Sequence, residues 1–164
     1  ELEAELGLRP HADARAAPDV GMRENIALKR PAMQSSTRAG GGEAGRAVDG
    51  IADPRWAAGS CTHTQPQGES QPWWSVDLGR ARPVGRVRFL NRLEASERLR
   101  RWQVRLALGD GATADLRQGT PCGPVQVDPV AAGAWAETDC GGHPGQWVGV
   151  VLDAGSEGPD AVLT

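Results

Sequence analysis

The sequence has 164 residues, of which 39% are hydrophobic and 24% charged, a composition typical of a globular protein with room for one domain. Its formal net charge of −3 argues against a general attraction to nucleic acid. No apolar run reaches the roughly 20 residues that a membrane-spanning helix needs, and the chain does not begin with the basic, apolar and small-residue pattern of a signal peptide.

Residues 1–23 are predicted to form a tail or linker that precedes a globular domain over residues 24–164. The segment opens with a short helix-like patch and continues with alanine, proline and charged residues. Such a composition offers little apolar surface to bury. His11 within it is therefore interpreted as a solvated side chain.

The domain itself contains four segments that alternate apolar and polar residues with a period of two. They lie at residues 74–78, 87–90, 102–108 and 148–152, with glycine- and proline-rich turns between them. This pattern indicates antiparallel strands with one buried face, and no βαβ spacing or long helical period competes with it. The sequence predicts an all-β sandwich or barrel, with Trp74 in its core.

Three cysteines are an odd number. Cys122 and Cys140 bracket a Gly/Pro-rich stretch and are predicted to form a disulfide, which would stabilise the fold by about 3 kcal/mol. Cys61 is left unpaired. A zinc site is disfavoured because the cysteines, His63 and His143 show no CxxC or HxxxH spacing. A disulfide-bonded domain of this kind is expected to be secreted or extracellular.

Five short motifs follow one another along the domain: ENIALKRPAMQSS, AVDG, GSCTHT, PWWSVDLG and NRLEASERL. Together they resemble the F-type lectin (fucolectin) family. AVDG and PWWSVDLG indicate only the broader discoidin-like (coagulation factor 5/8 type C) superfamily, whereas GSCTHT followed by NRxxxxxRL is specific to the lectins. The resemblance implies an antiparallel jelly-roll β-sandwich that recognises terminal L-fucose on glycans.

The resemblance also implies a sugar site built from His63, Arg92 and Arg98. A sugar hydroxyl gives up a water partner on binding, so the site needs strong, rigidly held hydrogen-bonding groups. His63 can donate from one ring nitrogen, and the two arginines offer charged donors. Glu94 stands where the family has an acidic residue that orients the arginines. The loop is one residue shorter than the family's pattern, so affinity and fine specificity are expected to differ.

Each of these assignments has a structural alternative. A histidine in a polar loop is usually structural or solvated, and His143 is interpreted in that way. Most arginines between Arg80 and Arg105 are expected to be the solvated face of strands, with a sulfated glycan as the alternative partner for that stripe. Trp56 is a candidate apolar wall for the sugar's methyl group, and a buried structural tryptophan is the equal alternative.

A calcium site is a further implication of the resemblance. Asp49 and Ser60 match positions that supply side-chain oxygens, while Arg46 and Ile51 match positions that supply backbone carbonyls. Calcium prefers such hard oxygen ligands. A simple Asp-Gly turn at Asp49 is the alternative that AVDG alone favours.

In the family a closing strand carries a Cys-Glu pair, in which the cysteine pairs with Cys61 and the glutamate ligates calcium. The sequence ends at Thr164, where EGPDAVLT begins to resemble this strand. We therefore expect a C-terminally truncated domain that lacks its final strand and binds calcium weakly.

Three function classes follow. A lectin without catalysis is favoured by His63, Arg92 and Arg98 together. Its expected partners are fucosylated glycans, and its expected role is in innate immunity. A homo-oligomer is compatible with this function. The alternative is a discoidin-like adhesion module that binds phospholipid or protein, but the polar loop THTQPQGESQ lacks the exposed apolar residues that such binding needs. Neither nucleic-acid binding nor membrane insertion is expected.

An enzyme is the third class, for example a glycosidase that uses Glu94 and Glu97. The surrounding arginines would keep both carboxylates charged and unsuited to donate a proton. The sequence also lacks a nucleophile motif, a phosphate-binding loop and HExxH. The chain is therefore predicted not to be an enzyme.

Overall fold

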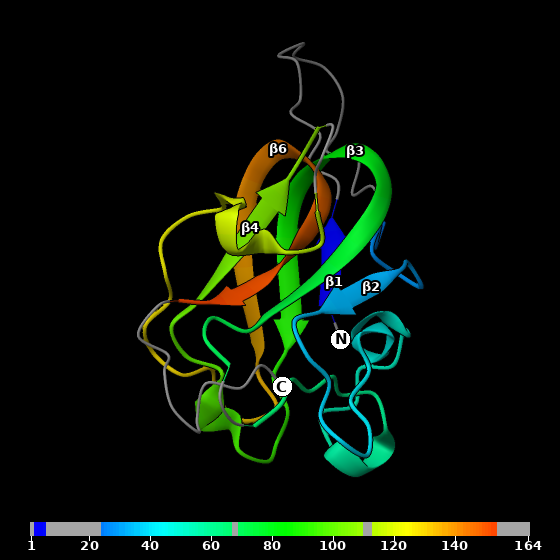
Figure 1. Ribbon diagram of the computed structural model, residues 1–164, viewed down its shortest axis with the longest axis vertical. Coiled ribbons are helices and arrows are strands. Elements are labelled where there is room, and N and C mark those ends of the chain that lie inside the picture. The colour runs from blue at the N-terminus through cyan, green and yellow to red at the C-terminus, as the bar shows by residue number, and fades with distance from the viewer. Residues whose placement is uncertain (1, 6–23, 67–68, 110–112, 154–164) are drawn as a thin grey trace, which may run out of the picture.

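The computed structural model describes residues 2–5, 24–66, 69–109 and 113–153, and these form an antiparallel all-β fold (Figure 1). Its strands are β1 (Leu2–Glu5), β2 (Ala32–Gln34), β3 (Trp73–Leu90), β4 (Trp102–Ala107), β5 (Thr120–Pro121) and β6 (Trp135–Leu152). Short 3-10 helices lie in the connections: η1 (Ala44–Val48), η2 (Trp56–Ala58), η3 (Ser96–Arg98) and η4 (Leu116–Gln118). No helix among these residues is long and apolar enough to span a membrane.

The two long strands, β3 and β6, organise the sandwich. They pair with each other in antiparallel fashion and arch together over the top of the molecule (Figure 1). Their register shifts between Asp77 and Arg82 and again between Val84 and Arg86, and such irregularities let a strand bend. Because both strands bend, the first half of β3 pairs with β2, and its second half pairs with β1.

The remaining strands extend the same ladder. The hydrogen-bonded order is β1-β3-β6-β4-β5, with β2 also on β3 and every pairing antiparallel. The predicted all-β antiparallel fold is confirmed. The segments 74–78 and 87–90, which alternate separately in the sequence, are two ends of one continuous strand. The segment EGPDAVLT, where the resemblance places the start of the closing strand, lies outside the described residues, so the expected lack of that strand stays a prediction.

The prediction of a tail over residues 1–23 is wrong for its first residues. Leu2–Glu5 forms β1, and the side chains of Leu2 and Ala4 are only 2% and 0% exposed. Ile26 donates its N–H to the carbonyl of Ala4. The second half of β3 offers a free row of backbone donors and acceptors, and an alternating LEAE segment can satisfy them while burying its two apolar residues. Residues 6–23, including His11, lie outside the described residues.

The core lies between the two layers. Trp74 is buried there, as predicted, and its indole N–H donates to the carbonyl of Ala44. Phe89 and Trp102 pack edge-to-face, with their ring centroids 4.8 Å apart. The predicted disulfide between Cys122 and Cys140 is confirmed, and both of its residues are buried.

Gly149 provides a test of how closely the strands approach in the core. It lies opposite Ser75 in the ladder, and an added Cβ would overlap the carbonyl oxygen of Trp74 and lie 2.7 Å from the Cα of Ser75. We expect Gly149→Ala to destabilise the fold by about 3 kcal/mol, because a rigid backbone cannot move aside cheaply. Urea unfolding measures the loss.

Gly45→Ala is the matched control, since a Cβ at Gly45 meets no atom within 4 Å. It should change the unfolding free energy by less than about 0.5 kcal/mol. Equal stability of the two variants would contradict the close strand approach.

Candidate functional site

The loops at the end of the sandwich opposite the arch enclose a pocket of about 450 Å³. The connection from β2 to β3 and the connection from β3 to β4 both contribute to it. Its lining residues are Arg38, Trp56, Ala57, His63, Pro66, Arg92, Glu94 and Arg98. The structure thus brings together all five residues predicted for the sugar site, which lie up to 42 positions apart between Trp56 and Arg98. It adds Arg38, which the sequence analysis did not single out.

Two backbone hydrogen bonds fix the segment that carries His63. The N–H of His63 donates to the carbonyl of Gly42 at 2.9 Å, and the N–H of Arg38 donates to the carbonyl of His63 at 3.0 Å. Gly42 has a φ of +103°, and a Cβ there would lie 2.7 Å from the Cβ of His63. Only glycine allows this conformation and this approach without strain. The glycine-rich loop therefore packs directly against the backbone and Cβ of His63.

Gln34, at the end of β2, ties these loops together. Its Nε2 donates to the carbonyl of Gly42 at 3.0 Å and to that of His63 at 3.3 Å, and its Oε1 accepts from the hydroxyl of Thr62. A single amide thus joins two loops that are distant in sequence. Sequence reasoning missed this role because a glutamine at a strand end carries no distinctive motif.

We expect the imidazole of His63 to be neutral at pH 7, with one favoured tautomer. Its Nδ1 lies 2.5 Å from the carbonyl oxygen of Thr64, which can only accept, so Nδ1 carries the proton. Burial lowers the pKa of His63, the bond to Thr64 raises it, and the charges of Arg92, Arg38 and Arg98 lower it further. In the neutral ring the remaining nitrogen, Nε2, accepts a hydrogen bond rather than donating one. The nitrogen that donates is thus already bonded to Thr64, and the role of His63 toward a sugar stays a prediction.

Arg92 is held in place before any ligand arrives. Its side chain is 7% exposed, and its Nε donates to the backbone carbonyl of Glu94. Burial lowers the pKa of Arg92, and the nearby charge of Arg98 lowers it further. Its guanidinium carbon lies 5.7 Å from the centre of the Trp56 ring.

Trp56 stands at the centre of this group. The guanidinium carbon of Arg38 lies 5.2 Å from the same indole ring, and the ring of His63 meets it edge-on at 5.5 Å. Arg38 and Arg92 are thus both within the range of a cation–π attraction to Trp56. The indole is half-buried, so it is neither a fully buried structural residue nor an isolated surface one.

The segment that carries Arg98 is anchored by Asn91. Asn91 is fully buried, and its Nδ2 donates to the carbonyls of Ser96 and Val130 at 3.0 and 2.7 Å. Ala95 adopts a φ of +51°, which lets the shortened loop turn back within a few residues. The Nε of Arg98 is buried and has no hydrogen-bond partner within the described chain. Asn91 is a positioning residue that the sequence analysis did not identify.

Glu94 contacts Arg92 through its backbone carbonyl, and the orienting role that the resemblance implies for its carboxylate stays a prediction. Its Oε2 accepts the backbone N–H of Trp56 at 3.2 Å, while its backbone carbonyl accepts from Arg92. Among the described residues, no salt bridge joins Glu94 to Arg92 or Arg98. The longer acidic side chain instead reaches across to the loop that carries the tryptophan.

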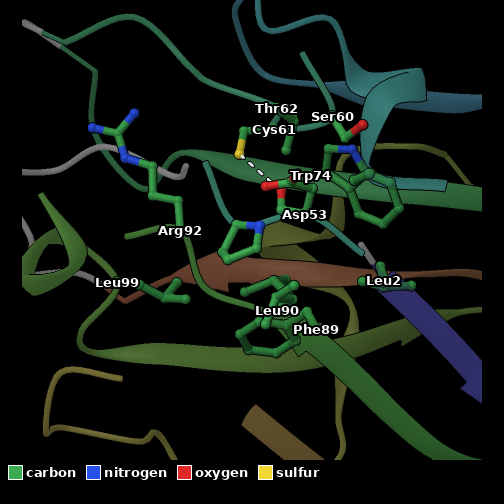
Figure 2. Close-up of a pocket in the computed structure, with 13 residues that line it drawn as sticks. Leu2, Asp53, Ser60, Cys61, Thr62, Trp74, Phe89, Leu90, Arg92 and Leu99 are labelled. Carbon is green, nitrogen blue, oxygen red and sulfur yellow. Dashed lines mark hydrogen bonds between the residues drawn. The ribbon is translucent and has the colours of Figure 1, made fainter. Parts of the chain in front are cut away.

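A smaller cavity of about 50 Å³ lies beside the pocket, and Arg92 lines both (Figure 2). Its walls are mainly apolar and include Phe89 and Leu99. Figure 2 shows the guanidinium of Arg92 pointing away from this cavity, so that only the aliphatic stem borders it. Cys61 is a free thiol here, as predicted, and its Sγ lies 4.0 Å from the carbonyl of Asp53. Burial raises the pKa of this thiol.

Three of the four predicted calcium ligands, Arg46, Asp49 and Ile51, lie in one turn. An Oδ1 of Asp49 accepts the N–H of Ile51 at 2.7 Å, and the N–H of Asp49 points to the carbonyl of Arg46 at 3.5 Å. Ser60 is buried in the following loop. No group of three or more His, Cys, Asp or Glu side chains that could hold a metal occurs in the described ranges.

Comparison with known proteins assigns the family. Residues 46–150 match the model of the F5/F8 type C family described as a NedA-like, galactose-binding domain. An f-lectin (fucolectin) from striped bass (Morone saxatilis) serum superposes with a TM-score of 0.71 at 32% identity, covering 85% of this chain and 44% of that one. The lectin domain of lectinolysin, complexed with Lewis B antigen, gives 0.66 at 31% identity, covering 85% and 90%. The chain belongs to the F-type lectins of the discoidin-like superfamily.

Curated relatives of this F-type lectin include Fucolectin-5 of Anguilla japonica, 36% identical over 85 residues, and Fucolectin of Anguilla anguilla, 37% identical over 79 residues. These matches cover 49% and 46% of the chain, and 44% and 49% of the relatives. The F-type lectin thus spans about half the length of the curated relatives that it matches. The predicted sandwich fold is confirmed. The relatives and structures named here are lectins, in line with the prediction that the chain is not an enzyme.

The protonation state of His63 can be measured directly. We expect its imidazole to titrate below its usual pKa of about 6.5, because burial and the three arginines oppose a further charge. A pH series of the histidine NMR resonances, assigned with His63→Gln, reports the midpoint. The unfolded chain takes up this proton more readily than the folded one, so this histidine reduces stability as the pH falls below about 6.5. A midpoint at or above 6.5 would contradict the neutral assignment.

Proposed function

We propose that this F-type lectin binds the terminal L-fucose of glycans in the pocket that His63, Arg92 and Arg98 line. The observation that carries the proposal is the convergence of these three side chains, from two separate loops, on a single pocket. The names of similar proteins support it: fucolectins among the relatives and a fucose binding module of Streptococcus pneumoniae among the structures, the latter with a TM-score of 0.63 at 27% identity.

The three side chains can meet both hydrogen-bonding needs of a sugar hydroxyl, because one of them accepts and two donate. A hydroxyl donates one hydrogen and accepts through its lone pairs. In our proposal, Nε2 of His63 accepts a hydroxyl hydrogen, while Arg92 and Arg98 donate to hydroxyl or ring oxygens. Arg92 is buried and already bonded to the carbonyl of Glu94, so little side-chain freedom is lost when the sugar binds.

Trp56 supplies the apolar contact in this proposal. Fucose is a deoxyhexose with one methyl group. That methyl group can be buried from water by packing on the indole ring, which lies beside the donors. The half-buried state of Trp56 within the pocket supports this role. The disulfide between Cys122 and Cys140 supports the proposal of a secreted protein, because such bonds persist in oxidising compartments.

Replacing Arg92 tests the sugar proposal. Arg92→Ala should weaken L-fucose binding at least tenfold, because one charge-assisted hydrogen bond contributes about 1.5–3 kcal/mol. Isothermal titration with L-fucose measures the change, and D-galactose should bind more weakly than L-fucose to the unchanged protein.

Arg100→Ala is the control, since Arg100 follows the same loop but is exposed and does not line the pocket. Retained fucose affinity in a folded Arg92→Ala protein would refute the assignment. Binding to anionic phospholipid vesicles with no response to fucose would favour the adhesion alternative instead.

We also propose a weak calcium site at the Asp49 turn. Asp49 and Ser60 would offer side-chain oxygens, and Arg46 and Ile51 would offer carbonyls. Calcium takes roughly six to eight oxygens, so these residues fit only part of its shell, and Asp49 is their single carboxylate. When bound, calcium would tie the turn to the loop that precedes His63.

Calcium titration tests this site. We expect a dissociation constant on the order of 10⁻⁴ to 10⁻³ M, because a single charged ligand compensates little of the ion's hydration. Asp49→Asn should abolish the binding seen by isothermal titration. Tight stoichiometric binding would show that the site has stronger ligands than those proposed.

A further inference from the structure

The pocket holds three arginines that lack acidic partners. Within the described residues, none of Arg38, Arg92 and Arg98 forms a salt bridge. Elsewhere in the described part of the chain five arginines do, in the pairs Arg46–Glu43, Arg55–Asp53, Arg86–Glu137, Arg101–Asp153 and Arg117–Asp115. The fold therefore pairs arginines readily where acids are near, and this pocket is an exception.

Two acids in neighbouring loops pair with arginines that do not line the pocket. Glu43 pairs with Arg46 at 2.6 Å, and Asp53 pairs with Arg55 at 2.5 Å. Glu94 is the acid that lines the pocket, and its Oε2 accepts the N–H of Trp56. His63 adds no negative charge in either of its protonation states. The described lining thus carries three positive charges against one negative charge.

Gathering like charges in this way is unfavourable without an anion. Arg92 is 7% exposed, and the Nε of Arg98 is buried without a partner, so water screens neither side chain fully. Burial and the charge of Arg98 both oppose the charged form of Arg92, which lowers its pKa. A neutral sugar supplies hydrogen-bond acceptors but leaves this repulsion in place. An anionic group in the pocket would relieve it.

Arg38 is placed to meet such a group. It comes from a different loop than the other two arginines, and its guanidinium lies 5.2 Å from the indole of Trp56, on which it can rest by cation–π attraction. Its backbone N–H is bonded to the carbonyl of His63, which fixes its distance from the proposed sugar site. Arg38 also stands outside the His63, Arg92 and Arg98 set to which we assign the fucose itself.

We propose that the pocket prefers fucosylated glycans that carry an anionic group, a sulfate ester or a carboxylate, on the sugar next to the fucose, and that Arg38 recognises this group. The inference rests on the proposed fucose site. Guanidinium forks match the geometry of both oxyanions and form short, charge-assisted hydrogen bonds with them. Arg38 is thus a specificity-determining residue.

The test compares three matched oligosaccharides by isothermal titration: a neutral fucosylated trisaccharide, the same compound sulfated on the sugar beside the fucose, and the same compound bearing a sialic acid there. At least one acidic compound should bind about tenfold more tightly than the neutral one, the effect of one charge-assisted bond. Raising the salt concentration should reduce this ratio. The sulfate and sialic-acid arms show which oxyanion the pocket takes.

Arg38→Gln should bring the ratio of acidic to neutral affinity close to one, whereas Arg80→Gln, on the exposed part of β3, should leave it unchanged. An unchanged ratio in Arg38→Gln would overturn the role of Arg38. Equal affinity of the unchanged protein for all three compounds would overturn the acidic preference while the fucose site stands. Failure to bind any fucosylated compound would refute the proposed function itself, and equal binding of a sulfated glycan without fucose would overturn the combined specificity.

Discussion

The antiparallel pairing of β3 with β6 is the interaction on which the remaining structure depends. Because both strands bend over the top of the molecule, one continuous ladder serves both layers of the sandwich (Figure 1). The bend also returns both ends of β3 to the same end of the molecule. The loop before Trp73 and the loop after Leu90 therefore emerge together, and these loops carry His63 and Arg92. The bend of β3 therefore brings together the two loops that form the pocket.

The electrostatics of the pocket follow from what surrounds each group. The carbonyl of Thr64 fixes the proton on one nitrogen of His63, and three arginines oppose a second proton. The same arginines repel one another, since the acid among them, Glu94, is bonded to a backbone N–H. The result is a neutral acceptor beside several charged donors, an arrangement suited to ligands rich in hydroxyl and anionic oxygens.

The sequence predicted the polar members of the site because they stand in dense local motifs. GSCTHT and NRLEASERL each carry chemistry that a short stretch displays, and the structure places them in one pocket. Gln34, Arg38 and Asn91 were not identified. The side chains of Gln34 and Asn91 bond to backbone carbonyls of other loops, and the guanidinium of Arg38 lies over the ring of Trp56. No local pattern shows which distant group a side chain will reach. For the same reason the sequence did not indicate that the carboxylate of Glu94 accepts the N–H of Trp56 in another loop.

Alternation of apolar and polar residues by itself determined that the chain is all-β and antiparallel, and the spacing of Cys122 and Cys140 indicated their disulfide. Only the tertiary structure decided that residues 74–78 and 87–90 belong to one bent strand, and that Leu2–Glu5 completes a layer rather than forming a tail. Period-two alternation records which face of a strand is buried. It does not record which edge the strand pairs with, since that choice is made by backbone groups common to every residue.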